Sequence, residues 1–232
     1  MALRGLAYGG PPYITDDPEP TDFRHFEIYF FQTGTSSRFG IDGATGIDFN
    51  YGAVPDLQLT AVLPVGFQTQ SHGPTAVNLS NVELAAKYRL LHQTRIGLDA
   101  AIFPRLFLPA GSSTVGQRHP SLLVPIWLER DQGPWSTFGG GGYEFHLGGK
   151  SRDFFQLGWV ITRKILPNLQ IGAEIYHQSA EALDAKDSTG VDAGFIYDLD
   201  DHFHLMGTMG PGIQNANDAN RYSWYTALLA TF

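Results

Sequence analysis

Twelve segments in which apolar and polar residues alternate, each roughly ten residues long, account for most of this chain. A period of two is the pattern of β-strands whose two faces meet different surroundings. Five connections are short, and the six between them are longer and rich in Gly, Ser, Asn and Asp. Short turns at one end and long loops at the other are typical of an outer-membrane barrel. The predicted strands are 23–33, 44–53, 57–67, 80–90, 95–108, 121–130, 135–145, 153–163, 169–178, 189–198, 202–210 and 221–232; the predicted short turns are 54–56, 91–94, 131–134, 166–168 and 199–201; the predicted long links are 34–43, 68–79, 109–120, 146–152, 179–188 and 211–220.

Residue parity assigns one face of a predicted strand to lipid and the other to the lumen. Every odd position of 57–67 is apolar, whereas Gln58 lies on the even face. The odd positions of 169–175 are apolar too, and Glu174 lies on the even face. We expect the apolar set to face lipid, because a charge at mid-depth on that face costs about 2–4 kcal/mol. The segment 202–210 shows no clear preference.

The composition favours one all-β domain with a face in lipid. Charged residues make up 16% of the 232 residues, whereas soluble domains carry about 25%. No apolar run approaches the roughly 18 residues of a membrane-spanning helix. With no cysteine, disulfides and Cys-ligated zinc are excluded. The net charge of −8 argues against nucleic acid as a partner.

The last predicted strand ends at Phe232 and alternates aromatic and aliphatic residues from Tyr222 onward. An exposed edge of this kind invites aggregation, whereas in a closed barrel the last strand pairs with the first. A terminal Phe resembles the signal that the outer-membrane barrel-assembly machinery reads, so that machinery is an expected partner. Residues 1–10 lack the apolar core of a signal peptide.

A soluble barrel or sandwich also alternates, with its apolar face turned inward. An eight-stranded barrel already has an interior just filled by side chains. Twelve strands with apolar residues inside would therefore enclose a wide dry cavity. The transmembrane arrangement avoids this, and the sequence predicts a single closed antiparallel transmembrane β-barrel in the bacterial outer membrane.

Several segments resemble the outer-membrane proteins named for the meta-pathway of phenol degradation. The resemblance extends over residues 11–232 and implies an outer-membrane barrel that passes or binds small, often hydrophobic, molecules. The family name does not establish phenol as the substrate, and the resemblance transfers no catalytic or binding residue. The segments that carry it are 11–20 (PPYITDDPEP), 23–27 (FRHFE), 50–59 (NYGAVPDLQL), 83–89 (ELAAKYR), 133–142 (GPWSTFGGGG) and the closing strand.

The candidate permeant-lining residues are charged and aromatic side chains at lumen parity. Charges of this kind select permeants by field and hydrogen bonding, or pair across the bore and hold the wall together. The aromatic members form a stacking track for apolar solutes or narrow the bore. The set is Glu27, Tyr29, Asp48, Glu83, Lys87, Arg89, Asp99, Phe103, Arg105, Trp127, Glu144, Glu174, Tyr176, Asp192 and Tyr225.

Residues 1–22 form a Pro-rich N-terminal arm that precedes the barrel of residues 23–232. Its prolines keep it extended and poor in ladder hydrogen bonds. The arm is expected at the periplasmic mouth, as a plug in the lumen, a strap across the base or a loose leader. In the plug, acidic arm residues would meet Arg89 or Arg105.

The four glycines at 139–142 lie within a predicted strand. Glycine there marks a point of curvature or a close approach of another backbone, such as the arm. Curvature is the preferred interpretation.

An enzymatic alternative depends on His119 and Ser121, which have the same parity. Some outer-membrane barrels carry a lipase site with a Ser–His pair on the outer wall. Here no third orienting group or nucleophile motif is evident. No cofactor or metal is expected. The sequence therefore favours a channel that passes small, partly aromatic or hydrophobic molecules by passive or weakly selective diffusion, with a lipase-like hydrolase or a non-conducting structural barrel as alternatives.

Overall fold

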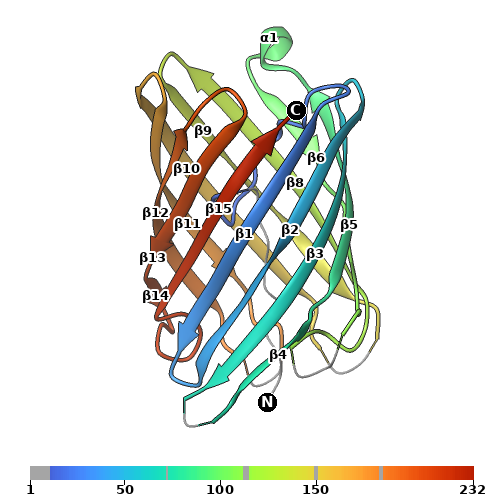
Figure 1. Cartoon of the computed structure of the whole chain (residues 1–232), viewed down its shortest axis with the longest axis vertical. Helices are drawn as coiled ribbons and strands as arrows, with labels where there is room; N and C mark the ends of the chain where they lie inside the picture. Colours follow the sequence, from blue (N-terminus) through green and yellow to red (C-terminus); the bar gives the residue numbers. More distant parts are fainter. Residues whose placement is uncertain (1–10, 72, 112–114, 149–150, 183–184) are drawn as a thin grey trace.

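The chain forms a closed antiparallel β-barrel, shown in Figure 1. This computed structural model describes residues 11–71, 73–111, 115–148, 151–182 and 185–232. The first and last strands pair with each other, which leaves no free edge. The elements are β1 (Phe26–Ser37), β2 (Gly40–Val54), β3 (Leu57–Gln70), β4 (Thr75–Leu79), β5 (Val82–Leu91), α1 (Gln93–Ile96), β6 (Asp99–Ile102), β7 (Arg105–Leu108), β8 (Ser121–Gln132), β9 (Trp135–His146), β10 (Phe154–Leu166), β11 (Leu169–Gln178), β12 (Ser188–Asp198), β13 (Phe203–Gly210), β14 (Gly212–Gln214) and β15 (Tyr222–Thr231).

Fifteen strand segments make twelve barrel strands, as the sequence predicts. β4 and β5 both pair with β3, β6 and β7 both pair with β8, and β13 and β14 both pair with β12. Each pair of segments is therefore one interrupted barrel strand. Proline explains two of the interruptions, at Pro104 and Pro211, because it has no N–H to donate. The wall stays closed at the first of them, where Ala86 N donates to the Pro104 carbonyl at 3.2 Å.

Three predicted connections are wrong. The long link at 68–79 lies mostly in strands, because β3 continues to Gln70 and β4 covers Thr75–Leu79. The long link at 34–43 is a tight turn at 38–39, because β1 and β2 continue well beyond their predicted ends. The short turn at 91–94 is longer and contains the helix α1, in a region where the sequence pattern predicted a strand from 95. Gly97 closes α1 at φ 79°, a left-handed conformation that favours glycine.

The turn between β12 and β13 is held by a carboxylate. Asp200 Oδ1 accepts the backbone N–H groups of His202 and Phe203, both at 2.8 Å. These bonds favour the charged carboxylate and lower the pKa of Asp200. The turn belongs to the end of the barrel that also carries the chain terminus Phe232, which we call the short-turn end. In outer-membrane barrels this end is periplasmic, and we call the opposite end the long-loop end.

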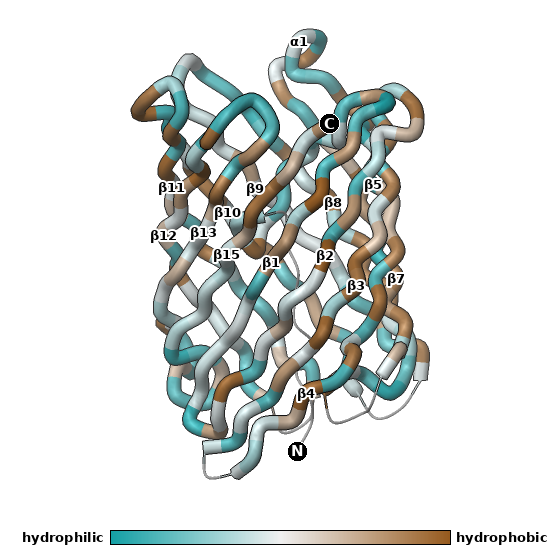
Figure 2. The backbone as a smooth tube through the Cα atoms, in the orientation of Figure 1, coloured by the Kyte–Doolittle hydropathy of each residue, from teal (hydrophilic) through white to brown (hydrophobic). Residues whose placement is uncertain are grey.

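Apolar side chains cover the outer surface and polar side chains turn inward, as parity predicts. Leu63 is 60% exposed and Ile175 is 50% exposed, whereas Glu83 is 1% exposed. Hydrophobic and hydrophilic residues alternate along many of the strands in Figure 2. A closed barrel with an apolar exterior and a polar interior places the chain in the bacterial outer membrane. α1 is four residues long, and no helix in the described ranges has the length and hydropathy to cross a membrane.

Aromatic rings cover several of the glycines that would otherwise expose backbone on the outer face. A side chain at Gly34 would collide with the indole of Trp224, its direct partner on β15. The same arrangement joins Gly139 to Trp159. An aromatic ring that packs over a glycine on the neighbouring strand in this way stabilises the pairing of the two strands. It explains why β1 continues through residues 34–37, where the sequence suggests a loop.

Replacing Ile161 by Arg is expected to destabilise the barrel by about 2–4 kcal/mol, the cost of a charge at mid-depth on the lipid face. Ile161 is 48% exposed, near the middle of β10. Leu166→Arg, at the short-turn end of the same strand, should cost about 0–1 kcal/mol. Urea unfolding in lipid vesicles, followed by tryptophan fluorescence, measures both. Equal effects would contradict the assigned depth.

Candidate functional site

The described part of the N-terminal arm, residues 11–22, contacts inward-facing side chains from several strands. The hydroxyl of Thr208 on β13 donates to the carbonyl of Pro12 at 2.8 Å. At the end of the arm that leads into β1, Thr21 N donates to Gln58 Oε1 on β3 at 2.8 Å. Tyr13 is 4% exposed. Contacts with strands this far apart in the barrel place the segment within its interior.

Glu174 on β11 binds the backbone of the arm directly. Its two carboxylate oxygens accept the N–H groups of Ile14, at 3.0 Å, and Thr15, at 2.6 Å. Proline keeps the neighbouring arm residues out of a regular ladder, so these N–H groups have no strand to bond. One inward carboxylate therefore satisfies two consecutive donors of the arm.

Lys87 on β5 is the cationic anchor of the arm. Its Nζ lies 2.9 Å from Asp16 Oδ1 and 3.5 Å from Asp17 Oδ1, and it also donates to the Glu19 carbonyl at 3.2 Å. The Phe103 ring centroid lies 5.0 Å from the same ammonium. The sequence predicts that acidic arm residues meet Arg89 or Arg105. Arg89 does approach Glu19, at 3.6 Å, but the principal partner of the arm is Lys87.

Glycines on three consecutive strands make room for the arm. A side chain at Gly158 on β10 would collide with Thr15, and one at Gly172 on β11 would collide with the Tyr13 hydroxyl. Gly194 on β12 lies opposite Gly172 and also borders the Tyr13 ring. These glycines are not among the predicted site residues, although each falls at inward parity. Inward glycines on three neighbouring strands are the sequence signal that could have indicated space for the arm.

The glycines at 139–142 do not receive the arm. Side chains there would meet the neighbouring strands, for example Pro125 from Gly142 and Leu157 from Gly141. A close approach of the wall strands is what the curvature interpretation requires.

Beside the arm, toward the short-turn end, lies a cavity of about 340 Å³ that we call the short-turn cavity. One side is charged: Arg105 donates to both oxygens of Glu83, at 2.7 and 2.9 Å, and both residues are buried. The other side is apolar and includes Met206 and Leu229. The cavity thus offers an apolar wall facing a charged one. The predicted lining residues that border it are Glu27, Tyr29, Asp48, Glu83, Lys87, Phe103 and Arg105.

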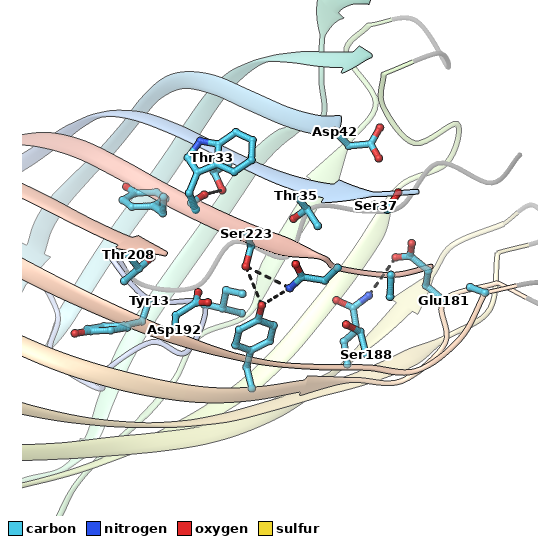
Figure 3. A pocket seen from close by; sticks show the side chains of 18 of the residues that line it. Tyr13, Thr33, Thr35, Ser37, Asp42, Glu181, Ser188, Asp192, Thr208 and Ser223 are labelled. Atoms are coloured by element: carbon cyan, nitrogen blue, oxygen red, sulfur yellow. Dashed lines mark hydrogen bonds between the residues drawn. The ribbon is translucent and has the colours of Figure 1, made fainter. Parts of the chain in front are cut away.

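Toward the long-loop end, Tyr13 borders a second cavity, of about 140 Å³, which we call the long-loop cavity. Figure 3 shows Tyr13, Asp192 and Ser223 around it. Asn220 Nδ2 donates to the Tyr176 hydroxyl, which lies 2.9 Å from Ser223 Oγ. The predicted lining residues that border this cavity are Tyr176, Asp192 and Tyr225.

The remaining predicted lining residues lie elsewhere. Trp127 is 1% exposed on β8, and Glu144 is buried on β9 near the long-loop end. Arg89 and Asp99 belong to the short-turn rim. Arg89 Nε lies 3.0 Å from Asp56 Oδ1, and Asp99 Oδ1 accepts the N–H of Gln93 in α1 at 2.9 Å. These two side chains support turns.

The serine–histidine site of the enzymatic alternative is not formed on the outer wall by Ser121. This residue is 0% exposed, and its hydroxyl donates inward to Gln117 Oε1 at 3.0 Å. No hydrogen bond joins it to His119 among the residues that the structure describes. Within the same ranges, no group of three or more His, Asp or Glu side chains could hold a metal ion.

Solved structures with the same fold come from the outer membrane. An outer-membrane channel of Pseudomonas putida F1, called COG4313, superposes with a TM-score of 0.74 at 12% identity, over 92% of this chain and 97% of that one. The KdgM porin in complex with oligogalacturonate gives 0.61 at 13% identity, over 90% and 99%. The translocator domain of the NalP autotransporter from Neisseria meningitidis gives 0.54 at 11%, over 91% and 89%. At these identities the likeness shows the fold. No family model matches the sequence, and no curated protein matches it.

Proposed function

We propose that this chain is an outer-membrane channel for small molecules whose lumen is plugged by its N-terminal arm. The observation that carries this proposal is the way the arm is held. Glu174 holds its backbone, and Lys87 holds its carboxylates. Water or a solute can replace polar contacts of this kind. The apolar packing of the described arm is concentrated at Tyr13, which forms a small buried cluster with Phe138 and Val160.

The two cavities support a route through the barrel. The short-turn and long-loop cavities, of about 340 and 140 Å³, are both bordered by arm residues. A displaced arm would join them into one path along the polar wall. A structural barrel has no need for polar cavities on both sides of a displaceable segment.

The short-turn cavity also suggests what passes. Sites for small molecules are commonly apolar with a few placed polar groups. Met206, Leu229 and Phe103 supply apolar and aromatic surface, and Arg105 and Glu83 supply charge. This combination favours a small aromatic or hydrophobic molecule with one polar group. It agrees with the resemblance to the proteins named for the meta-pathway of phenol degradation, and we propose membership of that family.

Conductance across a planar bilayer tests the proposal. The full chain is expected to conduct weakly, because residues 11–22 of the arm occupy the lumen. Deletion of residues 1–22 should raise the conductance several-fold, and small phenols should block the opened channel. Heat-modifiable migration on gels shows that both proteins are folded. A folded deletion variant that conducts no better than the full chain would rule out the arm as a plug.

A further inference from the structure

The long-loop cavity has an excess of acidic side chains. Asp42, Glu181 and Asp192 line it, and Lys186 is its one basic lining residue among those that the structure describes. The Lys186 ammonium lies 2.7 Å from a carboxylate oxygen of Asp218, which is not a lining residue. This lysine therefore forms its ion pair with Asp218, outside the cavity lining.

Asp192 is the deepest of these carboxylates and is 5% exposed. Its Oδ1 has no hydrogen-bond partner and lies over Gly210, where a side chain would collide with it. Glu174, 3% exposed, lies directly opposite on β11. Neither carboxylate takes part in any ion pair found in the described ranges. Glu174 accepts the two arm N–H groups, and Asp192 has a hydrogen bond with Ser223. A buried charge with no opposite charge beside it is costly, so a cation that reaches this point would be stabilised.

Asn220, which borders the same cavity, carries a second buried oxygen without a partner. Asn220 is 5% exposed, and its amide nitrogen is used by Tyr176 and Ser223, whereas its Oδ1 has no partner. The unpaired oxygens of Asp192 and Asn220 are both hydrogen-bond acceptors. A ligand that satisfies them must bring N–H or O–H donors, and a primary ammonium group carries three N–H donors with a positive charge.

The rest of the cavity suits the body of such a ligand. Tyr13, Tyr176 and Tyr225 border it, and aromatic faces attract cations. Its volume of about 140 Å³ resembles that of an engineered cavity of roughly 150 Å³ that binds benzene. A molecule with one ring therefore fits.

We propose that the long-loop cavity binds a small organic ammonium ion, with the ammonium group on the oxygens of Asp192 and Asn220 and the hydrocarbon body against Tyr13. This deepens the proposed function and rests on it, since it specifies the charge of one class of permeant. The cavity would disfavour anions, because Asp192, one of its buried lining residues, is a carboxylate.

Calorimetric titration of the folded full chain in detergent tests this proposal. Three probes of similar shape differ in charge: benzylamine, benzyl alcohol and benzoate. Benzylamine is expected to bind saturably and the other two at least about tenfold more weakly, a difference of about 1.4 kcal/mol. Comparable binding of benzyl alcohol or benzoate would overturn the proposal.

Matched variants locate the site. Asp192→Asn keeps the shape and removes the charge, and should weaken benzylamine binding about tenfold or more. Asp201→Asn makes the same change in an exposed turn at the short-turn end and should leave binding unchanged. If Asp192→Asn does not fold, Asn220→Asp provides the test, because a second carboxylate should strengthen binding. Unchanged affinity in the folded Asp192 variant, or weaker binding in the Asn220 variant, would overturn the proposal. Titration needs no conduction, so a silent barrel that still binds benzylamine separates failure of the channel proposal from failure of this one.

Discussion

A protein with Thr15→Cys and Gly158→Cys is expected to pass solutes several-fold more slowly when oxidised than when reduced. A side chain at position 158 falls within 3.2 Å of the Cβ atom of Thr15, close to the Cβ separation in disulfides. The chain has no other cysteine, so the pairing is unambiguous. The disulfide would fix the arm to β10, and reduction would release it. Solute uptake into proteoliposomes with and without dithiothreitol measures the difference.

A disulfide in the wall provides the control for this experiment. Ala173 and Ala193 lie directly opposite each other on β11 and β12 and face lipid. Ala173→Cys with Ala193→Cys would join two strands without touching the arm, and its uptake should not depend on redox state. If the oxidised arm-locked protein transports as fast as the reduced one, the arm does not move during transport.

The barrel itself follows from local sequence patterns. Strand parity separates Ile175 from Glu174 without any knowledge of the neighbouring strands, because lipid and lumen impose opposite chemistry on alternate residues. The tight turn at 38–39 could not be predicted in this way. β1 continues through Gly34 because Trp224, almost two hundred residues later, covers it. Cross-strand packing of this kind has no local signal.

The position of the arm follows from contacts that are distant in sequence. The prolines and acidic residues of the arm predict an extended segment that pairs with a cation, and Asp16 does form such an ion pair. The sequence does not show that this cation is Lys87 and not Arg89 or Arg105, because the inward position of each depends on the assembled barrel. Tyr13 fits because Gly172 and Gly194 are opposite each other, and that register follows from the β11–β12 pairing. Inward parity gives the candidates, but only the assembled wall shows which of them are adjacent.

Replacing Arg105 by Met is expected to destabilise the folded barrel by about 3–5 kcal/mol. Arg105 is 3% exposed and holds both oxygens of Glu83, which is 1% exposed. The guanidinium also lies 5.3 Å from the centroid of the Phe103 ring. Removing the arginine leaves a buried carboxylate with its principal partner gone, and that penalty exceeds the net value of the pair itself. Urea unfolding in lipid vesicles, followed by tryptophan fluorescence, gives the change in free energy.

Two comparisons separate the buried pair from a general effect of losing arginine. Arg163 is exposed and lies over the ring of Trp135 at 5.0 Å, so Arg163→Met should cost no more than about 1 kcal/mol. Arg105→Met combined with Glu83→Leu removes both charges and should recover most of the lost stability, because apolar pairs replace buried ion pairs at little cost. An Arg105→Met variant no less stable than Arg163→Met would mean that water reaches Glu83. The charged wall of the short-turn cavity would then be a hydrated surface, open to any small polar solute.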